Sequence, residues 1–327
     1  MGKRVLVTGG SGLLGNELIL QLLQRGHSVL AIQHKSQISI SHPGLQIQSC
    51  SLGDIGLLIQ LMEGIDEVYH VAGKVSFLPS EKQDLYKINA EGTANVVEAC
   101  LSSSIKKMLY VSSVAVLEKS PGAEMITEEM QWVGNAKRSA YGESKFLAEM
   151  EVWRGAAEGL NMVIVNPSII LGEGNWDEGS TALFKNVYNQ FPWYSEGVNG
   201  FVDVKDTAQL MIMLMESDTV NERFIISAEN LSYQSLFEKM AAAFNKKPPQ
   251  KKITPFLASI AWRAEALKYR ITGKRPLVTK ETAATALKKS RYNNQKILQK
   301  FPGFTFRPID ETVRRVAVSL QQKLNKP

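Results

Sequence analysis

The chain has 327 residues, of which 44% are hydrophobic and 21% are charged, and its formal net charge at pH 7 is +6. This composition predicts a folded protein with a substantial core, built as one large α/β domain or as a nucleotide domain with a smaller partner. No run approaches the roughly 20 apolar residues that cross a bilayer. We therefore expect a cytoplasmic protein without stable membrane insertion or a secretory leader.

The cysteines and the basic residues argue against two further classes. Cys50 and Cys100 stand alone, which suggests a reducing compartment and no bound metal. The basic excess lies in short clusters such as Lys246-Lys247 and Lys288-Lys289, without interleaved stacking aromatics. We expect no nucleic-acid partner, although the mild basicity suits an anionic small molecule.

The first half of the chain alternates short apolar runs with helical patterns. Apolar runs such as Val5-Leu6-Val7 do not alternate with polar residues, which is typical of strands buried on both faces. Strands are expected at 4–8, 28–33, 45–49, 67–71, 108–112 and 162–166, with the clearest helices at 12–25, 54–62, 89–103 and 141–158. This alternation predicts right-handed βαβ units and a parallel sheet covered on both sides.

The character of the sequence changes after residue 170. Residues 172–200 are rich in Gly, Asn, Trp and Pro, one more strand is expected at 221–228, and the rest is mainly helical. We predict a nucleotide-binding domain formed by residues 1–170 and 200–229. A smaller, mostly helical substrate domain would comprise 171–199 and 230–327 and close over the carboxyl ends of the strands, where ligands bind in open α/β sheets.

A glycine-rich turn, Thr8-Gly9-Gly10-Ser11-Gly12-Leu13-Leu14-Gly15, follows the first strand and opens the first helix. Gly9 permits a tight turn, Gly12 lets the backbone approach a pyrophosphate, and Gly15 lets the helix pack against the sheet. The helix N-terminus adds unpaired N–H groups and a positive dipole end. The pattern predicts a dinucleotide site in an α/β fold of the Rossmann type, with a doubly wound parallel sheet.

The end of the second strand bears on the choice between NAD and NADP. An acidic side chain there would bond the adenosine ribose 2′-hydroxyl of NAD and repel a 2′-phosphate. The chain has no acid at this point, and Gln33, His34, Lys35 and Ser36 can all donate hydrogen bonds to a phosphate. We favour NADP(H). NAD(H) remains the alternative if His34 and Lys35 are only solvent-facing loop residues.

A phenol and an ammonium lie on one face of the helix expected at 141–158, because Tyr141 and Lys145 are four residues apart. The ammonium, helped by a positive nicotinamide, would lower the tyrosine pKa toward a working value, and the lysine could hold the nicotinamide ribose. Upstream, a buried strand ends in Ser112 and Ser113. Ser113 could hydrogen-bond a substrate oxygen, whereas Ser112 is equally explained as a satisfied strand-end hydroxyl.

Together these motifs resemble an extended short-chain dehydrogenase/reductase of the NAD-dependent epimerase/dehydratase superfamily, over nearly the whole chain. Further matching segments are 70–73 (HVAG), 89–93 (NAEGT), 111–113 (VSS), 166–172 (NPSIILG) and 201–206 (FVDVKD). The resemblance implies that Tyr141 is the proton donor-acceptor, Lys145 the cofactor-ribose ligand and Ser113 the carbonyl partner. The residues expected at the cofactor are Gly9, Ser11, Gly12, Leu13, Leu14, Gly15, Gln33, His34, Lys35, Ser51, Leu52, Val71, Ala72, Gly73, Asn89, Val111, Ser112, Tyr141, Lys145, Pro167, Ser168 and Ile169.

One segment departs from the family pattern. Many relatives carry Asp-Leu-x-x-Asp after the third strand, with the first aspartate on the adenine amino group, whereas this chain has Ser51-Leu52-Gly53-Asp54. The serine puts that adenine contact in doubt. Asp54 is expected to cap the next helix instead.

More than one function remains open. The chain resembles the dihydroflavonol 4-reductase-like branch at 166–168 and 272–279, which implies carbonyl reduction or alcohol oxidation by hydride transfer. Ser113-Val114-Ala115 lacks the Thr-Asp-Glu of sugar 4,6-dehydratases, and Val116-Leu117-Glu118 lacks the Val-Tyr-Gly of many sugar epimerases. A nucleotide-sugar epimerase or dehydratase is the alternative, and a non-catalytic dinucleotide sensor or scaffold is the second.

Substrate contacts are expected just after the fourth strand and in the small domain. Polar contacts would come from Lys74, Ser76 and Ser113, and Lys74, Arg263 or Arg275 could bind a diphosphate. Aromatic side chains could form an apolar wall for a small apolar substrate, or could equally be core of the small domain: Phe77, Trp176, Phe184, Trp193, Tyr194 and Phe201.

Two helical regions bear on partners. The resemblance implies a homodimer formed through the helices around 89–103 and 141–158. The apolar helical run 255–269 either buries one face in the substrate lid or touches a membrane.

Overall fold

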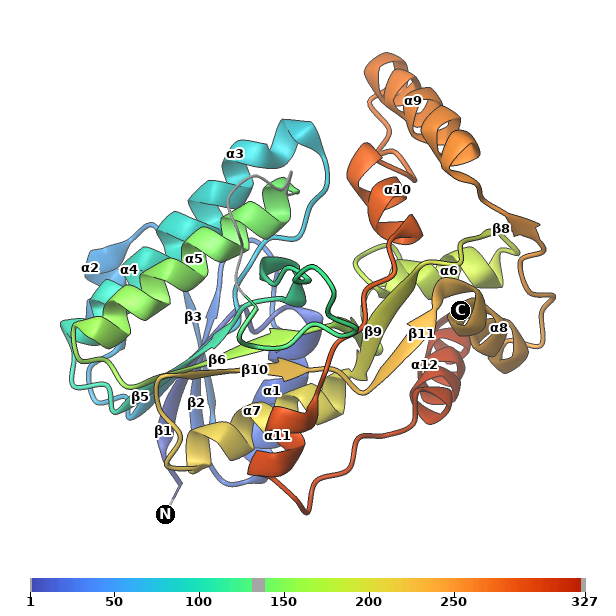
Figure 1. The fold of residues 1–327 in the computed structure, drawn as a ribbon. Helices are drawn as coiled ribbons and strands as arrows, with labels where there is room; N and C mark the ends of the chain where they lie inside the picture. The colour runs from blue at the N-terminus through green and yellow to red at the C-terminus, as the bar shows by residue number, and fades with distance from the viewer. Residues whose placement is uncertain (1, 131–138, 325–327) are drawn as a thin grey trace.

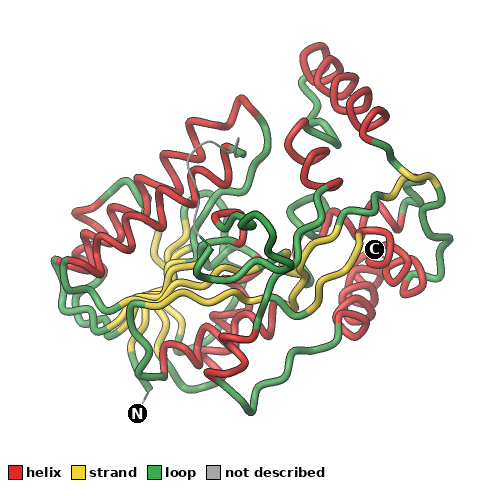
Figure 2. The backbone as a smooth tube through the Cα atoms, in the orientation of Figure 1, coloured by secondary structure: helices red, strands yellow, loops and turns green. Residues whose placement is uncertain are grey.

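The computed structural model describes residues 2–130 and 139–324 and is built on a seven-stranded parallel sheet (Figures 1 and 2). The strand order is β10-β6-β5-β4-β1-β2-β3. The strands are β1 (Arg4–Thr8), β2 (Ser28–Gln33), β3 (Leu45–Ser49), β4 (Glu67–His70), β5 (Lys107–Val111), β6 (Met162–Pro167) and β10 (Glu222–Ile226). The order reverses between β1 and β4, which leaves a crevice at their carboxyl ends. The predicted doubly wound Rossmann fold is confirmed.

Helices cover both faces of this sheet, as strands with nearly uninterrupted apolar sequences require. One apolar core joins the sheet to α1 (Leu13–Gln24), α7 (Val204–Glu216) and α11 (Gln295–Lys300). On the other face lie α2 (Ile55–Leu61), α4 (Gly92–Leu101) and α5 (Ala140–Ala157). Short α3 (Lys82–Leu85) and a π-helix over Tyr86–Glu91 precede α4, so the helix expected at 89–103 begins with a π-helical turn.

Beside the central sheet, the chain forms a second, three-stranded sheet that the sequence did not predict. Its strands are β7 (Ile169–Leu171), β9 (Val198–Asp203) and β11 (Glu229–Ser232), and β8 (Trp193–Tyr194) pairs separately with β12 (Lys251–Lys252). The helices are α6 (Thr181–Tyr188), α8 (Tyr233–Ala243), α9 (Pro255–Thr272), α10 (Lys280–Leu287) and α12 (Ile309–Leu324). α6, α8 and α12 share an apolar core with this sheet. β9 spans residue 200, where we proposed a domain boundary, and it pairs with β7 on one edge and with β11 on the other.

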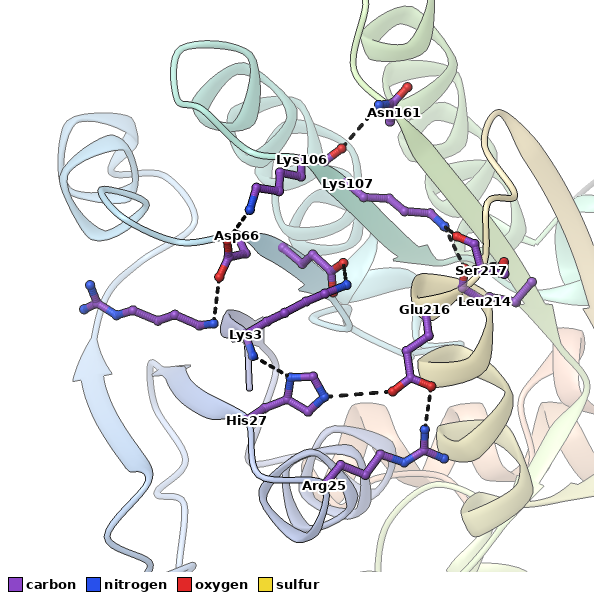
Figure 3. A network of polar contacts seen from close by, with 12 residues as sticks. Lys3, Arg25, His27, Asp66, Lys106, Lys107, Asn161, Leu214, Glu216 and Ser217 are labelled. Atoms are coloured by element: carbon purple, nitrogen blue, oxygen red, sulfur yellow. Dashed lines mark hydrogen bonds and ion pairs between the residues drawn. The ribbon is translucent and has the colours of Figure 1, made fainter. Parts of the chain in front are cut away.

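A polar network fastens the amino ends of the strands, at the end of the sheet away from the crevice (Figure 3). Arg25 and His27, at the end of α1, lie 2.8 Å and 4.0 Å from Glu216 of α7. The buried Lys107 ammonium donates to the carbonyl oxygens of Leu214 (2.7 Å) and Ser217 (2.9 Å). These contacts tie α1, α7 and β5 together, and we assign this end of the sheet to stability.

Candidate active site

The glycine-rich turn after β1 has the conformation that its sequence predicts. Gly9 has a φ of +73°, and a Cβ there would lie 2.6 Å from the backbone nitrogen of Ala72. A Cβ on Gly15 would lie 2.2 Å from the Gly9 carbonyl oxygen, so α1 packs directly on the turn. Among the glycines of this turn, Gly12 is the least crowded, because a Cβ there would meet only the Gly9 oxygen, at 3.4 Å. The missing side chain at Gly12 therefore leaves open space for a ligand.

The N-terminus of α1 fits an anionic group. Gly12 is its N-cap, and among the described residues no side chain caps the helix by a hydrogen bond. The first-turn N–H groups and the positive dipole end point into the cleft that Gly12, Leu13 and Leu14 line. An exposed, uncapped helix start beside a glycine that the fold does not crowd is what a dinucleotide pyrophosphate requires.

One large cleft, of about 3170 Å³, runs from this turn to α10. Ligand pockets are typically roughly 300–1,000 Å³, so this cleft can hold a dinucleotide and a second molecule together. Every residue that we expected at the cofactor lines it except Asn89. Asn89 lies behind the wall, where it accepts from the Lys74 N–H (2.7 Å) and donates to the Lys74 carbonyl (3.0 Å) and to Ser144 Oγ (2.9 Å).

The segment after β4 is held from beneath by a buried histidine that we did not single out. His70 Nδ1 lies 2.7 Å from Thr8 Oγ1, and Nε2 lies 2.9 Å from Thr93 Oγ1. Thr8 Oγ1 also accepts from the Ala72 N–H at 3.1 Å. Burial first, and then the charge of Lys145, lowers the pKa of His70 to about 3. His70, which is neutral at pH 7, thus links β1, β4 and α4 beneath this wall of the cleft.

At the ends of β2 and β3 some side chains hydrogen-bond to the backbone, while others are exposed at the cleft. Gln33 Oε1 accepts from the Ile38 N–H (3.1 Å), while His34 and Lys35 are exposed at the cleft. Ser51 lines the cleft as well, and its Oγ accepts from the Gly53 N–H at 3.2 Å. Asp54 Oδ1 accepts from the Leu57 N–H (3.0 Å), so the predicted N-cap is confirmed.

Ser113, Tyr141 and Lys145 meet on the wall of the same cleft. Ser139 caps α5 by accepting from the Gly142 N–H (3.0 Å), which fixes the first turn that carries Tyr141. The Tyr141 hydroxyl hydrogen-bonds with the Ser113 side chain. One turn further, the Lys145 ammonium donates to the Val111 carbonyl oxygen at 2.6 Å and lies 4.5 Å from the centre of the Tyr110 ring.

Burial dominates the protonation of both groups on α5. It raises the pKa of Tyr141, and the hydrogen bond with Ser113 opposes this shift. The expected lowering of the tyrosine pKa is therefore wrong for the protein without cofactor, because burial raises that pKa. Burial lowers the pKa of Lys145 from 10.5 to about 7, and the Glu149 carboxylate acts in the opposite direction.

The Glu149 carboxylate is the centre of a buried polar network behind the three residues. It accepts from Ser112 Oγ (2.6 Å), Asn166 Nδ2 (3.1 Å) and Arg223 Nη1 (2.9 Å). Ser112 is therefore a satisfied strand-end hydroxyl with a bracing role. The network joins β5, β6, β10 and α5 just behind Ser113, and the sequence offered only the four-residue step from Lys145 to Glu149 as a signal.

Residues 5–227 match the NAD dependent epimerase/dehydratase family. The chain belongs to that family. It is 28% identical to the "Putative dihydroflavonol 4-reductase" of Synechocystis sp. over 91% of this chain and 89% of that protein. It is 24% identical to cinnamoyl-CoA reductase 1 of Petunia hybrida, over 100% of this chain and 94% of that protein. The crystal structure of gox2253 is 27% identical and superposes with a TM-score of 0.82, covering 98% of this chain and 99% of that one.

Membership makes the protein an oxidoreductase-type enzyme of an NAD-binding family. The residues present fit a dinucleotide, because the uncapped α1 and the open side of Gly12 face the cleft. In the part of the chain described, no group of three or more His, Cys, Asp or Glu side chains could hold a metal ion.

Only half of the aromatic residues that we expected to contact a substrate line the cleft. Phe77, Trp193 and Tyr194 line the cleft, and the Phe77 ring meets Tyr141 edge-on at 5.8 Å. The prediction of a substrate wall is wrong for the other three, which lie in the core of the small domain. They pack against neighbouring rings that cover them: Trp176 on Tyr188 and Phe244, Phe184 on Phe244, and Phe201 on Tyr233.

The cations that we considered for a diphosphate are engaged elsewhere. Lys74 Nζ lies 2.7 Å from Asp84 and 3.1 Å from Glu81, and Arg275 lies 2.5 Å from Glu81. Arg263 is exposed on α9, does not line the cleft, and donates to the Ser259 carbonyl oxygen at 2.9 Å. Ser76 lines the cleft beside Phe77.

Proposed function

We propose that the protein is an NADP(H)-dependent oxidoreductase that reduces a carbonyl, or oxidises a secondary alcohol, of a small apolar substrate. The observation that carries the proposal is the meeting of Ser113, Tyr141 and Lys145 on one wall of the cleft that begins at the uncapped helix α1. The bound dinucleotide would supply or accept the hydride. The reductases among the relatives support this reaction class.

In this proposal each of the three residues has a defined role. Ser113 donates a hydrogen bond to the substrate oxygen and stabilises its developing charge. Tyr141 delivers the proton to that oxygen, or removes it in the reverse direction. Lys145 binds the nicotinamide ribose hydroxyls, and its ammonium favours the phenolate once Tyr141 has lost its proton. The residues that line the cleft from Gly9 to Ile169 would hold the rest of the dinucleotide.

The proposed NADP preference rests on the end of β2. His34 and Lys35 are exposed at the cleft, and the β2 end carries no acid that would repel a 2′-phosphate. Gln33 uses its side-chain oxygen on Ile38, which leaves its amide NH₂ as a donor. The Gln33 amide, His34 and the Lys35 cation are hydrogen-bond donors, and such a set suits a 2′-phosphate better than a 2′-hydroxyl.

The proposed apolar substrate rests on what the cleft does and does not offer. A nucleotide sugar needs cations for its diphosphate, but Lys74 and Arg275 are already neutralised by Glu81 and Asp84. Phe77, Trp193 and Tyr194 instead give the same space an aromatic lining. We place a small ketone or aldehyde against these rings, with its oxygen toward Ser113 and Tyr141.

We also propose a homodimer formed through α4 and α5. Leu147 and Met150 lie on the outer side of α5 with 40% of each side chain exposed. Large exposed apolar side chains on a helix that also packs on α4 suit a helix–helix contact between copies. The mass in solution tests this, and a Leu147→Glu variant should convert a dimer to a monomer.

The functional test is a fluorescence titration of the purified protein with NADPH and NADH, followed by aromatic ketones and nucleotide sugars. We expect tighter NADPH binding and net NADPH oxidation when a ketone is added, with at least about a hundredfold slower oxidation in Tyr141→Phe. Conversion of a nucleotide sugar without net cofactor consumption would replace the proposal with an epimerase. Equal turnover in Tyr141→Phe would remove Tyr141 from the mechanism, and cofactor binding without any turnover would favour a sensor or scaffold.

A further inference from the structure

Helix α9 carries an apolar face that the described part of the protein leaves uncovered. α9 begins at its Thr254 N-cap with Pro255 in the first turn, and it ends at Gly273 with a φ of +67°. Only Ala258 is buried among its 18 residues. Figures 1 and 2 show the helix projecting beyond α10, far from the central sheet.

The exposed face is a continuous stripe of large side chains. Phe256, Ile260, Leu267 and Ile271 are 72%, 50%, 59% and 75% exposed. Steps of four, seven and four residues place all four on one side of an α-helix, over about 23 Å of its length. Leu277, which follows the helix, is 68% exposed as well. Single exposed apolar residues are ordinary, but a stripe of this length marks an interaction surface.

The opposite face of α9 is the one that the protein uses. The Tyr269 hydroxyl lies 3.2 Å from Ser80 Oγ, and Glu265 accepts from the Leu277 N–H at 2.8 Å. The Lys280 ammonium lies 6.0 Å from the Trp262 ring. The helix is therefore docked by its Trp262–Tyr269 side, and the stripe faces away from the protein.

Basic residues border the stripe. Residues 255–281 contain six Lys or Arg and two Glu. Arg263 and Arg270 follow one edge and Lys268 the other, and all three are exposed. A second copy of the chain seated on this face would bring like charges together, whereas anionic lipid headgroups would complement them.

We propose that α9 binds the surface of an anionic lipid bilayer, with Phe256, Ile260, Leu267 and Ile271 inserted at the level of the headgroups. An amphipathic helix with a basic border and aromatic and aliphatic side chains on its apolar face lies in the interface plane. Within the described ranges, no helix is both long and apolar enough to span a bilayer, so this attachment is peripheral.

The attachment would bring the mouth of the cleft to the membrane. Arg275, Leu277 and Thr279, which follow α9, line the cleft together with α10. A small apolar substrate dissolved in the bilayer would then reach the Phe77 side of the cleft without crossing bulk water. This consequence rests on the proposed function, but the lipid binding itself does not.

The test is sedimentation of the 327-residue protein with vesicles of phosphatidylcholine alone and of phosphatidylcholine mixed with phosphatidylglycerol, without substrate. We expect binding to the anionic vesicles that falls with added salt. Phe256→Ser/Ile271→Ser should lower the partition coefficient at least about tenfold. Removing two charges in Arg263→Gln/Arg270→Gln should lower it roughly 30-fold. The matched control is Val220→Ser/Val318→Ser, which removes two exposed apolar side chains elsewhere and should bind like the wild type.

All substituted side chains are exposed, so thermal melting should match the wild type and report any loss of fold. No binding to anionic vesicles, or equal binding by Phe256→Ser/Ile271→Ser, would overturn the proposal. A self-associating wild type that does not bind vesicles and becomes monomeric in that variant would assign the stripe to a second copy instead. Because no turnover is measured, these results are independent of the reaction.

Discussion

Replacing Lys145 by methionine should stabilise the folded protein at neutral pH, and this gain should disappear as the pH rises. Methionine has similar length but no charge. The folded protein lowers the pKa of Lys145 to about 7 from 10.5, so the unfolded chain binds more protons between these two values. A base whose folded pKa is depressed destabilises the protein fully below the folded pKa, and this penalty disappears as the pH passes the unfolded pKa.

The two opposing contributions can be estimated. The protonation penalty is about 4 kcal/mol at pH 7 and falls to about 1 kcal/mol at pH 9.5. Against it, the variant loses the hydrogen bond to the Val111 carbonyl, which costs about 1–3 kcal/mol at either pH. Lys145→Met should therefore be more stable than the wild type by roughly 1–3 kcal/mol at neutral pH, and equal to it or less stable at pH 9.5.

The assay is urea unfolding of both proteins without cofactor across this pH range, with Lys268→Met as the exposed control on α9. The difference in unfolding free energy between Lys145→Met and wild type should change by about 3 kcal/mol, while the control stays flat. A pH-independent difference, or a uniform destabilisation by Lys145→Met, would show that the amine is not held in a desolvated site and would refute the reasoning.

Three further substitutions test other parts of the site. Tyr141→Phe should lower kcat by a factor of about 10²–10⁴ in steady-state assays while the NADPH dissociation constant is retained. Arg223→Met should lower the free energy of unfolding by about 3–5 kcal/mol, because it leaves the Glu149 carboxylate buried without its cation. The double variant Glu149→Met/Arg223→Met should recover much of that loss in the same denaturant titration. Lys35→Ala should weaken NADPH binding about tenfold and leave NADH binding unchanged, which a paired fluorescence titration measures.

The features predicted well from the sequence are those that depend on local spacing. The glycine turn and the Tyr141–Lys145 pair each fall within eight residues, so chain geometry alone brings their members together. The strands of the central sheet were predicted within about two residues, and for most of them the reason is that both faces are apolar; the edge strand β3, with the sequence LQIQS, is the exception. The Asp54 cap also depends on local spacing, because its partner is the N–H of Leu57, three residues away.

The errors concern features that depend on distant parts of the chain. Trp176 and Phe201 are aromatic whether they line a cleft or fill a core, and only their packing on Tyr188 and Tyr233 decides. The sheet formed by β7, β9 and β11 joins segments about 30 residues apart, which no local period reveals. The prediction for the tyrosine pKa is wrong because spacing predicts a nearby ammonium but not the burial that raises this pKa.

The same long-range network leads to a last prediction, in which a buried carboxylate tunes Lys145 from one helical turn away. Glu149 raises the pKa of Lys145 against the larger effect of burial. Removing its charge in Glu149→Gln should therefore lower that pKa below about 7, so the ammonium that we assign to the cofactor ribose is lost at a lower pH. The midpoint of the pH dependence of NADPH binding should shift downward in this variant.

Ser112→Ala is the control for this shift, because it removes a hydrogen bond to the same carboxylate but leaves the charge in place. If both variants moved the midpoint equally, Glu149 would act by holding the strands together and not by its charge. If Glu149→Gln moved it upward, the carboxylate would oppose the ammonium, contrary to the geometry. A downward shift in Glu149→Gln alone would mean that the network behind β5 sets the protonation of the residue in front of it.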